Sequence, residues 1–255
     1  MSFNIEEYIN NLSSDVTEID VSEKGITFLP DLSRFTNLEK LHCYYNSLTC
    51  LPQLPLTLTE LDCNFNQLKS LPSLPPILRF LDCNCNQLTN LPLLPSTLFD
   101  LRCNNNQLIS LPPLPSTIKY LYCEYNQLIS MPLLTSTLLY LHCNNNKLIN
   151  LPKLPSKIRK IYYNDNLIHD IIPRDITHHH LLNSTIINTI NSVTLKIYKF
   201  RHLYYCLKYK KRFRDLLWIK IREPKIKQYY SPSNLVLLLE GVEDEDVFHV
   251  VLSKW

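Results

Sequence analysis

Nine cysteines are the most reactive side chains in this 255-residue chain, and six of them recur at a constant step of 20 residues. Thiols stacked at one slot of a repeating structure could pair as disulfides or bind a soft metal ion. The alternative is that each thiol packs as a small apolar side chain in a core. We predict core packing, because each of the six follows a leucine by two residues and so shares its face of a strand, and because the N-terminus has no secretion-signal pattern. The six are Cys43, Cys63, Cys83, Cys103, Cys123 and Cys143.

A second group with metal-binding chemistry is the run from His178 to His180, with His169 nearby. Imidazole nitrogens are good zinc ligands. Three consecutive side chains on a regular element, however, cannot all point at one ion. We therefore predict a solvated loop here, with no metal site and no cofactor.

The motifs of common enzyme active sites are missing from the chain. The sequence contains no glycine-rich phosphate loop, no Gly-x-Ser-x-Gly and no His-Glu-x-x-His. We predict a protein that is not an enzyme and that has no catalytic residues.

The six cysteines belong to a longer phrase, Leu-x-x-Leu-x-Cys-x-x-Asn-x-Leu-x-x-Leu-Pro, which repeats between residues 38 and 171. A degenerate copy lies upstream, where Ile19 precedes Leu41 by 22 residues. A period near 20 indicates one short strand per repeat, stacked in parallel on its neighbours. We predict an α/β solenoid: a leucine-rich repeat horseshoe of about eight repeats over residues 19–172, with a parallel sheet on its concave face.

One asparagine of the phrase also keeps the step of 20. A side-chain amide held inside the turn after each strand can satisfy backbone groups that the turn leaves unpaired. We therefore assign this column a structural role. Its members are Asn46, Asn66, Asn86, Asn106, Asn126, Asn146 and Asn166.

The strand residues that point away from the core form the candidate binding surface. Along the array this surface passes from acidic and polar to aromatic side chains. Tyrosine is common at interfaces, because a rigid ring provides area and a hydroxyl provides direction. The alternative is that stacked rings only stabilise neighbouring strands. The candidate partner-binding residues are His42, Tyr44, Asp62, Asp82, Arg102, Tyr120, Tyr122, Tyr140, His142 and Tyr162.

The two ends of a solenoid need a cover, because terminal repeats would otherwise expose core. We predict a helical cap over residues 1–18, with Asn4 as N-cap, Glu7 at the reciprocal capping-box position and Phe3 packed on Tyr8.

Residues 173–255 do not repeat, and we predict a basic, mainly helical region. Between Lys196 and Lys227 there are 12 Lys or Arg and two acids, a local charge of +10. Such a cluster can bind anions or nucleic acid. It can also be the solvated side of a helix that caps the last repeat, and this is the interpretation we favour. The candidate anion-binding residues are Lys208, Lys210, Lys211, Arg212 and Arg214.

The phrase from Leu111 to Leu128, LPPLPSTIKYLYCEYNQL, resembles the Leu-Pro-x-Leu-Pro class of leucine-rich repeats. That class is found in bacterial effectors and in proteins of giant DNA viruses of amoebae. Cysteine in place of the more usual Val or Leu is similar to the viral, mimivirus-like versions, as are the tail motifs Trp218–Pro224 and Tyr230–Leu235. Some effector relatives carry a Cys-dependent ubiquitin ligase after the array. The tail here has only Cys206, so we do not transfer that activity.

The resemblance and the residues together predict a protein-binding scaffold that acts through the concave face and is viral or effector-like. The alternative is nucleic-acid or anion binding through the basic C-terminal helix. No apolar run reaches the roughly 18 residues that span a bilayer. We therefore expect a monomer inside the cell, in the host cytoplasm if the protein is viral, with a protein partner and no membrane contact.

Overall fold

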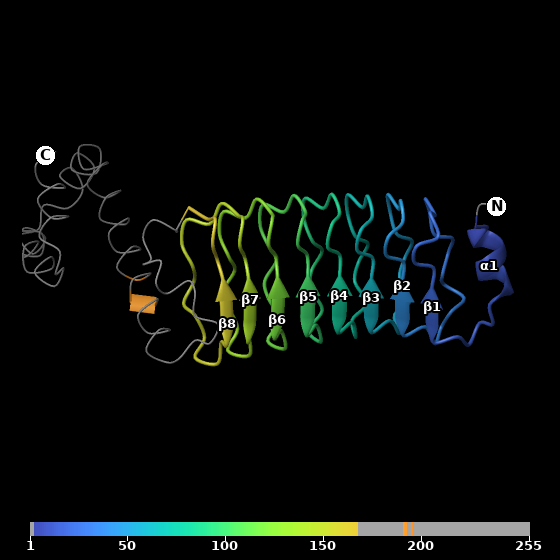
Figure 1. Ribbon diagram of the computed structural model, residues 1–255. Coiled ribbons are helices and arrows are strands. Elements are labelled where there is room, and N and C mark those ends of the chain that lie inside the picture. The colour runs from blue at the N-terminus through green and yellow to red at the C-terminus, as the bar shows by residue number, and fades with distance from the viewer. Residues whose placement is uncertain (1–2, 168–190, 193–194, 196–255) are drawn as a thin grey trace, which may run out of the picture. The chain divides into compact units, whose positions relative to one another are not determined.

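The computed structural model describes residues 3–167 together with residues 191, 192 and 195. In this part of the chain, eight parallel strands form one sheet and follow one another in sequence order (Figure 1). The strands are β1 (Glu18–Asp20), β2 (Lys40–His42), β3 (Glu60–Asp62), β4 (Phe80–Asp82), β5 (Asp100–Arg102), β6 (Tyr120–Tyr122), β7 (Tyr140–His142) and β8 (Lys160–Tyr162).

The constant period of the sequence sets the register of this sheet. From β2 onward each strand residue pairs with the residue 20 positions later, as Leu41 does with Leu61. Strands β1 and β2 are offset by 22 residues, which pairs Ile19 with Leu41. The predicted parallel-sheet solenoid is confirmed, and the degenerate first repeat belongs to it.

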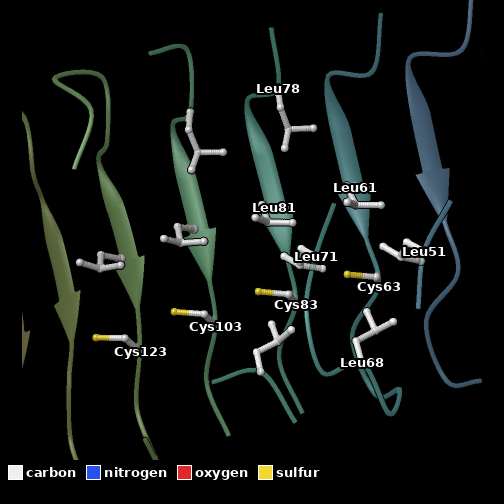
Figure 2. Packing of buried hydrophobic residues seen from close by; sticks show 14 of the residues in the cluster. Leu51, Leu61, Cys63, Leu68, Leu71, Leu78, Leu81, Cys83, Cys103 and Cys123 are labelled. Carbon is white, nitrogen blue, oxygen red and sulfur yellow. The ribbon is translucent and has the colours of Figure 1, made fainter. Parts of the chain in front are cut away.

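The core lies on one side of the sheet. The middle residue of each strand from β2 to β7 is a leucine without solvent exposure, and the cysteine two positions later is equally buried, as Leu81 and Cys83 are (Figure 2). Leucines of the return segment, such as Leu68 and Leu78, complete each layer. Full burial of one such side chain stabilises the fold by about 1.5–3 kcal/mol. Stacking therefore supplies a core that no single repeat has alone.

The asparagine column joins consecutive repeats. The Asn106 amide donates to the carbonyls of Cys103 and Asn104 in its own repeat, at 3.3 and 3.1 Å, and to that of Cys83 in the preceding repeat, at 2.9 Å. Its Oδ1 accepts from the backbone N–H of Leu88 at 3.0 Å. From Asn66 onward every column residue is only 8% exposed. The amides thus satisfy the turn, as the spacing predicts, and in addition bond each repeat to the one before it.

The residue before each column asparagine has a left-handed backbone. Its φ lies between 49° and 53° in all seven regular repeats, at Tyr45, Phe65, Cys85, Asn105, Tyr125, Asn145 and Asp165. Asparagine and aspartate tolerate this region, whereas bulky residues are strained there. This column cannot be read from the sequence, because none of these positions holds the glycine that usually marks such a turn.

A second connection between repeats comes from threonine on the return segment. The Thr117 hydroxyl donates to the carbonyl of Leu98 in the preceding repeat at 2.7 Å. The same bond, with lengths of 2.8–3.0 Å, recurs at Thr57, Thr97 and Thr137. These side chains satisfy carbonyls that a proline-rich return cannot pair by a backbone ladder.

Helix α1 (Ile5–Asn11) precedes the sheet and buries Ile5 and Ile9. Asn4 is its N-cap, since its Oδ1 accepts from the backbone N–H of Glu7 at 3.2 Å. The Glu7 carboxylate accepts from the Asn4 side-chain amide at 3.3 Å, so the reciprocal bond of a capping box is replaced by a side-chain pair. Phe3 and Tyr8 pack with ring centroids 5.3 Å apart.

Residues 191, 192 and 195 are helical. The Asn191 side chain bonds both backbone groups of Leu154: Oδ1 accepts from its N–H at 2.7 Å and Nδ2 donates to its carbonyl at 3.2 Å. The remainder of the predicted C-terminal region lies outside the described residues.

Candidate functional site

The outward-pointing residues of the strands form one continuous surface. We call this surface the sheet face and define it as the first and third residues of β1–β8 together with the residue two positions after each strand. All ten candidate partner-binding residues lie on it. Nine of them are half-buried, and Asp82 is buried. Their placement follows from the alternation of side chains on a strand.

The sheet face over β1–β4 is acidic, and its outer charges form weak pairs. Lys40 Nζ lies 3.9 Å from a Glu60 oxygen. His42 Nε2 lies 3.8 Å from a Glu18 oxygen. The His42–Glu18 contact is an ion pair only when His42 is protonated, and exposed pairs of this length contribute little to stability, so Glu18, Lys40 and Glu60 remain available to a partner.

Asp62 and Asp82 lie side by side at the centre of the acidic part, paired in register on β3 and β4. The Asp62 carboxylate accepts from the Asn64 amide and backbone N–H, and Asp82 accepts from the backbone N–H of Asn84. Loss of hydration raises the pKa of both carboxyls, that of Asp82 to about 6, because burial disfavours the charged form. Asp82 is only 6% exposed, whereas a strand residue that points away from the core is expected to be open to solvent.

Arg102 is held on the sheet face by one carboxylate and two rings. Its Nε and Nη2 donate to the two oxygens of Asp100 at 3.3 and 3.0 Å. Its guanidinium carbon lies 4.9 Å from the centre of the Phe80 ring and 5.5 Å from that of Tyr122. A guanidinium combines a bidentate ion pair with ring stacking in this way because it is planar.

Aromatic side chains cover the sheet face over β6–β8. Tyr120 and Tyr140 stack with centroids 5.2 Å apart and planes 17° from parallel. His142 lies between Tyr122 and Tyr162, with centroid distances of 4.7 and 4.4 Å. The rings therefore contact one another across strands, as the alternative interpretation expects. They are nonetheless half-buried rather than buried, so part of each ring faces outward.

Glu124 belongs to this aromatic part and was not among the candidate residues. Its Oε1 accepts from the Asn144 amide at 2.7 Å and lies 3.5 Å from His142 Nδ1. It occupies the same slot as Tyr44, two residues beyond the strand. This slot holds asparagine in most repeats, and that pattern could have marked Glu124 as the exception.

The cysteine column has no reactive geometry. Its six members are free thiols without solvent exposure. Burial raises the pKa of each well above its ordinary value. The Cys103 thiol donates to the carbonyl of Tyr122 at 3.3 Å. A protonated, enclosed thiol is neither a nucleophile nor a metal ligand.

Within residues 3–167 and the three described residues beyond them, no three His, Cys, Asp or Glu side chains form a group that could hold a metal ion. No helix of that same part is long and apolar enough to cross a membrane. The histidine run and the five candidate anion-binding residues lie outside the described residues.

Two solved structures of bacterial effectors are similar to this chain. The leucine-rich effector protein YopM from Yersinia pestis matches with a TM-score of 0.57 and 37% identity, over 59% of this chain and 43% of YopM. The leucine-rich repeat domain of a Shigella effector matches with a TM-score of 0.56 and 31% identity, over 65% of this chain and 76% of that domain. The chain thus spans less than half of YopM. No protein-family model and no curated protein sequence matches it. The resemblance to giant-virus proteins stays a prediction.

Proposed function

We propose that this chain, which belongs to the leucine-rich repeat proteins, is a non-enzymatic scaffold that binds another protein through its sheet face. The likeness to two bacterial effectors supports an effector-like role. The cysteine variant of the repeat extends the proposal to a viral effector, which would act on a protein of the host cytoplasm.

The observation that carries this proposal is the aromatic cluster of Tyr120, Tyr122 and Tyr140. The core lies on the opposite side of the sheet, so packing does not require aromatic residues at these positions. Rigid rings that are partly desolvated before binding lose little entropy at an interface. Stacking across strands accounts for part of their contact area and leaves the outward part of each ring for a partner.

The experiment is capture of proteins from host-cell extract with the full chain and with a variant in which Tyr120, Tyr122 and Tyr140 are alanine. We expect the variant to lose the captured protein, while its circular dichroism and cooperative unfolding persist. The matched control replaces three aromatics of the left-handed column, Tyr45, Phe65 and Tyr125, of which Tyr45 and Phe65 stack at 4.2 Å. Capture that is equal in both triple variants would refute the proposed surface.

A second candidate function is nucleic-acid or anion binding by the segment from Lys196 to Lys227. The charge of +10 in its sequence supports this function. Binding of RNA or DNA would then weaken steeply as salt rises, and replacement of the five candidate bases by glutamine would flatten the salt slope. Absence of binding at physiological salt would contradict this second function.

A further inference from the structure

We propose that the sheet face binds an extended, arginine-bearing segment of the partner, and that Asp62 and Asp82 together receive one of its guanidinium groups. This inference rests on the proposed function and specifies the chemistry of the partner. Three independent features of the sheet face support it.

The first feature is that the sheet face already holds one arginine of its own chain. Arg102 has a bidentate pair with Asp100 and a ring on each side, Phe80 and Tyr122. Carboxylates and aromatic rings are thus arranged here at the spacing that a guanidinium needs. A second guanidinium, supplied by a partner, would meet carboxylates at Asp62 and Asp82, which begin on the strand next to that of Arg102.

The second feature is that Asp62 and Asp82 have no such cation. Within the described residues, no Lys, Arg or His nitrogen lies within 4.0 Å of either carboxylate. Arg102, on the strand next to Asp82, is bonded to Asp100, and His42, on the strand next to Asp62, lies beside Glu18. Two neighbouring carboxylates that have lost part of their hydration also repel each other. A cation placed between them offsets both the repulsion and the lost hydration.

The third feature is the distribution of charge and rings along the sheet face. The strand positions from β1 to β4 carry five carboxylates, Glu18, Asp20, Glu60, Asp62 and Asp82, against the single ammonium of Lys40. Beyond β5, which carries the Asp100–Arg102 pair, lie the stacked rings of Tyr120 and Tyr140, whose faces attract a cation. Charge and ring complementarity together favour arginine over lysine in the partner.

The strand spacing sets the expected spacing of these arginines. From the midpoint of β3 and β4 to the midpoint of β6 and β7 there are three strand intervals, or roughly 14 Å. An extended segment covers that distance in about four residues. The preferred ligand therefore has arginines about four positions apart.

The test uses a fluorescent serine peptide with arginine at every fourth position and the full-length protein. The matched peptide has citrulline in place of arginine and so keeps the shape without the charge. We expect the wild type to bind the arginine peptide, and Asp62→Asn/Asp82→Asn to bind it about tenfold more weakly or worse. A control variant, Glu6→Gln/Asp165→Asn, removes two exposed charges away from the sheet face and is expected to bind as the wild type does.

Equal affinities of the two double variants would overturn the inference, since net charge alone would then explain binding. Equal affinities for the arginine and citrulline peptides would also overturn it. If binding appears only after the five bases from Lys208 to Arg214 are changed to glutamine, the chain's own tail is the occupant, and the inference fails. Loss of protein capture in the tyrosine variant, together with unchanged peptide binding in the aspartate variant, would keep the proposed function and reject only this inference.

Discussion

The side-chain amides of Asn106 and Asn104 differ in how many backbone groups they satisfy. Asn106 makes four hydrogen bonds and is buried. The Asn104 side chain accepts one bond, from the backbone N–H of Glu124 at 2.7 Å, and is half-buried. Asn104, although it lies on the sheet face, is therefore not a neutral solvent position.

We expect Asn106→Ala to lower the free energy of unfolding by about 2–3 kcal/mol and Asn104→Ala by about 1 kcal/mol or less. The larger loss arises because three carbonyls and one N–H lose a buried partner. Urea denaturation of the two variants measures the difference. Similar midpoints for both would show that the asparagine column does not hold the repeats together.

Asp82 makes folding stability depend on pH in the direction opposite to a salt-bridged carboxylate. Burial raises its pKa from 3.8 to about 6, so the folded protein binds this proton more tightly than the unfolded chain does. The resulting stabilisation is complete below about pH 4 and is lost as pH rises through about 6. The groups that face it are Asp62, which raises the pKa further, and Arg102 with the amides of Asn64 and Asn84, which lower it.

We therefore predict that Asp82→Asn stabilises the protein at about pH 7.5 by on the order of 2 kcal/mol and has no effect near pH 3.5. Asparagine keeps the acceptor for Asn84 and removes the buried charge. Thermal unfolding of the wild type and the variant across this range provides the measurement. A variant that is less stable than the wild type at neutral pH would contradict the burial of this charge. A costly carboxylate on a binding surface is the pattern expected where function competes with stability.

The strands and the core were predictable because the leucines and cysteines that define them recur every 20 residues without drift. One period fixed the register of all strands from β2 to β8, and the alternation of side chains separated Leu101 from Arg102. The left-handed column was not predictable, because Tyr125 or Phe65 at such a position runs against intrinsic preference and is imposed by the stacked neighbours. Burial of Asp82 also depends on the side chains of adjacent repeats, which a single repeat does not reveal.

The layered core makes a prediction about thiol reactivity. The six column cysteines should react slowly with a thiol reagent in the folded protein. Their side chains are not exposed to solvent, and their thiols are protonated. Cys50 is exposed and should react at once. Denaturant should make all six column cysteines reactive together, in one cooperative unfolding transition. Rapid labelling of most of the six without denaturant would rule out the core, and stoichiometric bound zinc would do the same.

At the scale of the whole array, the fold separates stability from recognition. The leucine and cysteine columns pack each repeat on its neighbours on the core side, the asparagine column bonds consecutive repeats in the turns, and threonine adds a bond on the return segment at four positions. The sheet face is thereby free to vary from repeat to repeat, and it changes from acidic to aromatic while the columns stay constant. A surface that is rigid and long in one direction suits an extended partner segment, which is the geometry we propose.

Site-specific photo-crosslinking tests the central claim, protein binding by the sheet face, most directly. A benzophenone amino acid is placed at Tyr140 on the sheet face or at Tyr125 in the exposed left-handed column, and each full-length protein is irradiated in host-cell extract. We predict one dominant adduct from position 140 that is absent from position 125. An adduct that forms from position 125 and not from position 140 would contradict the account.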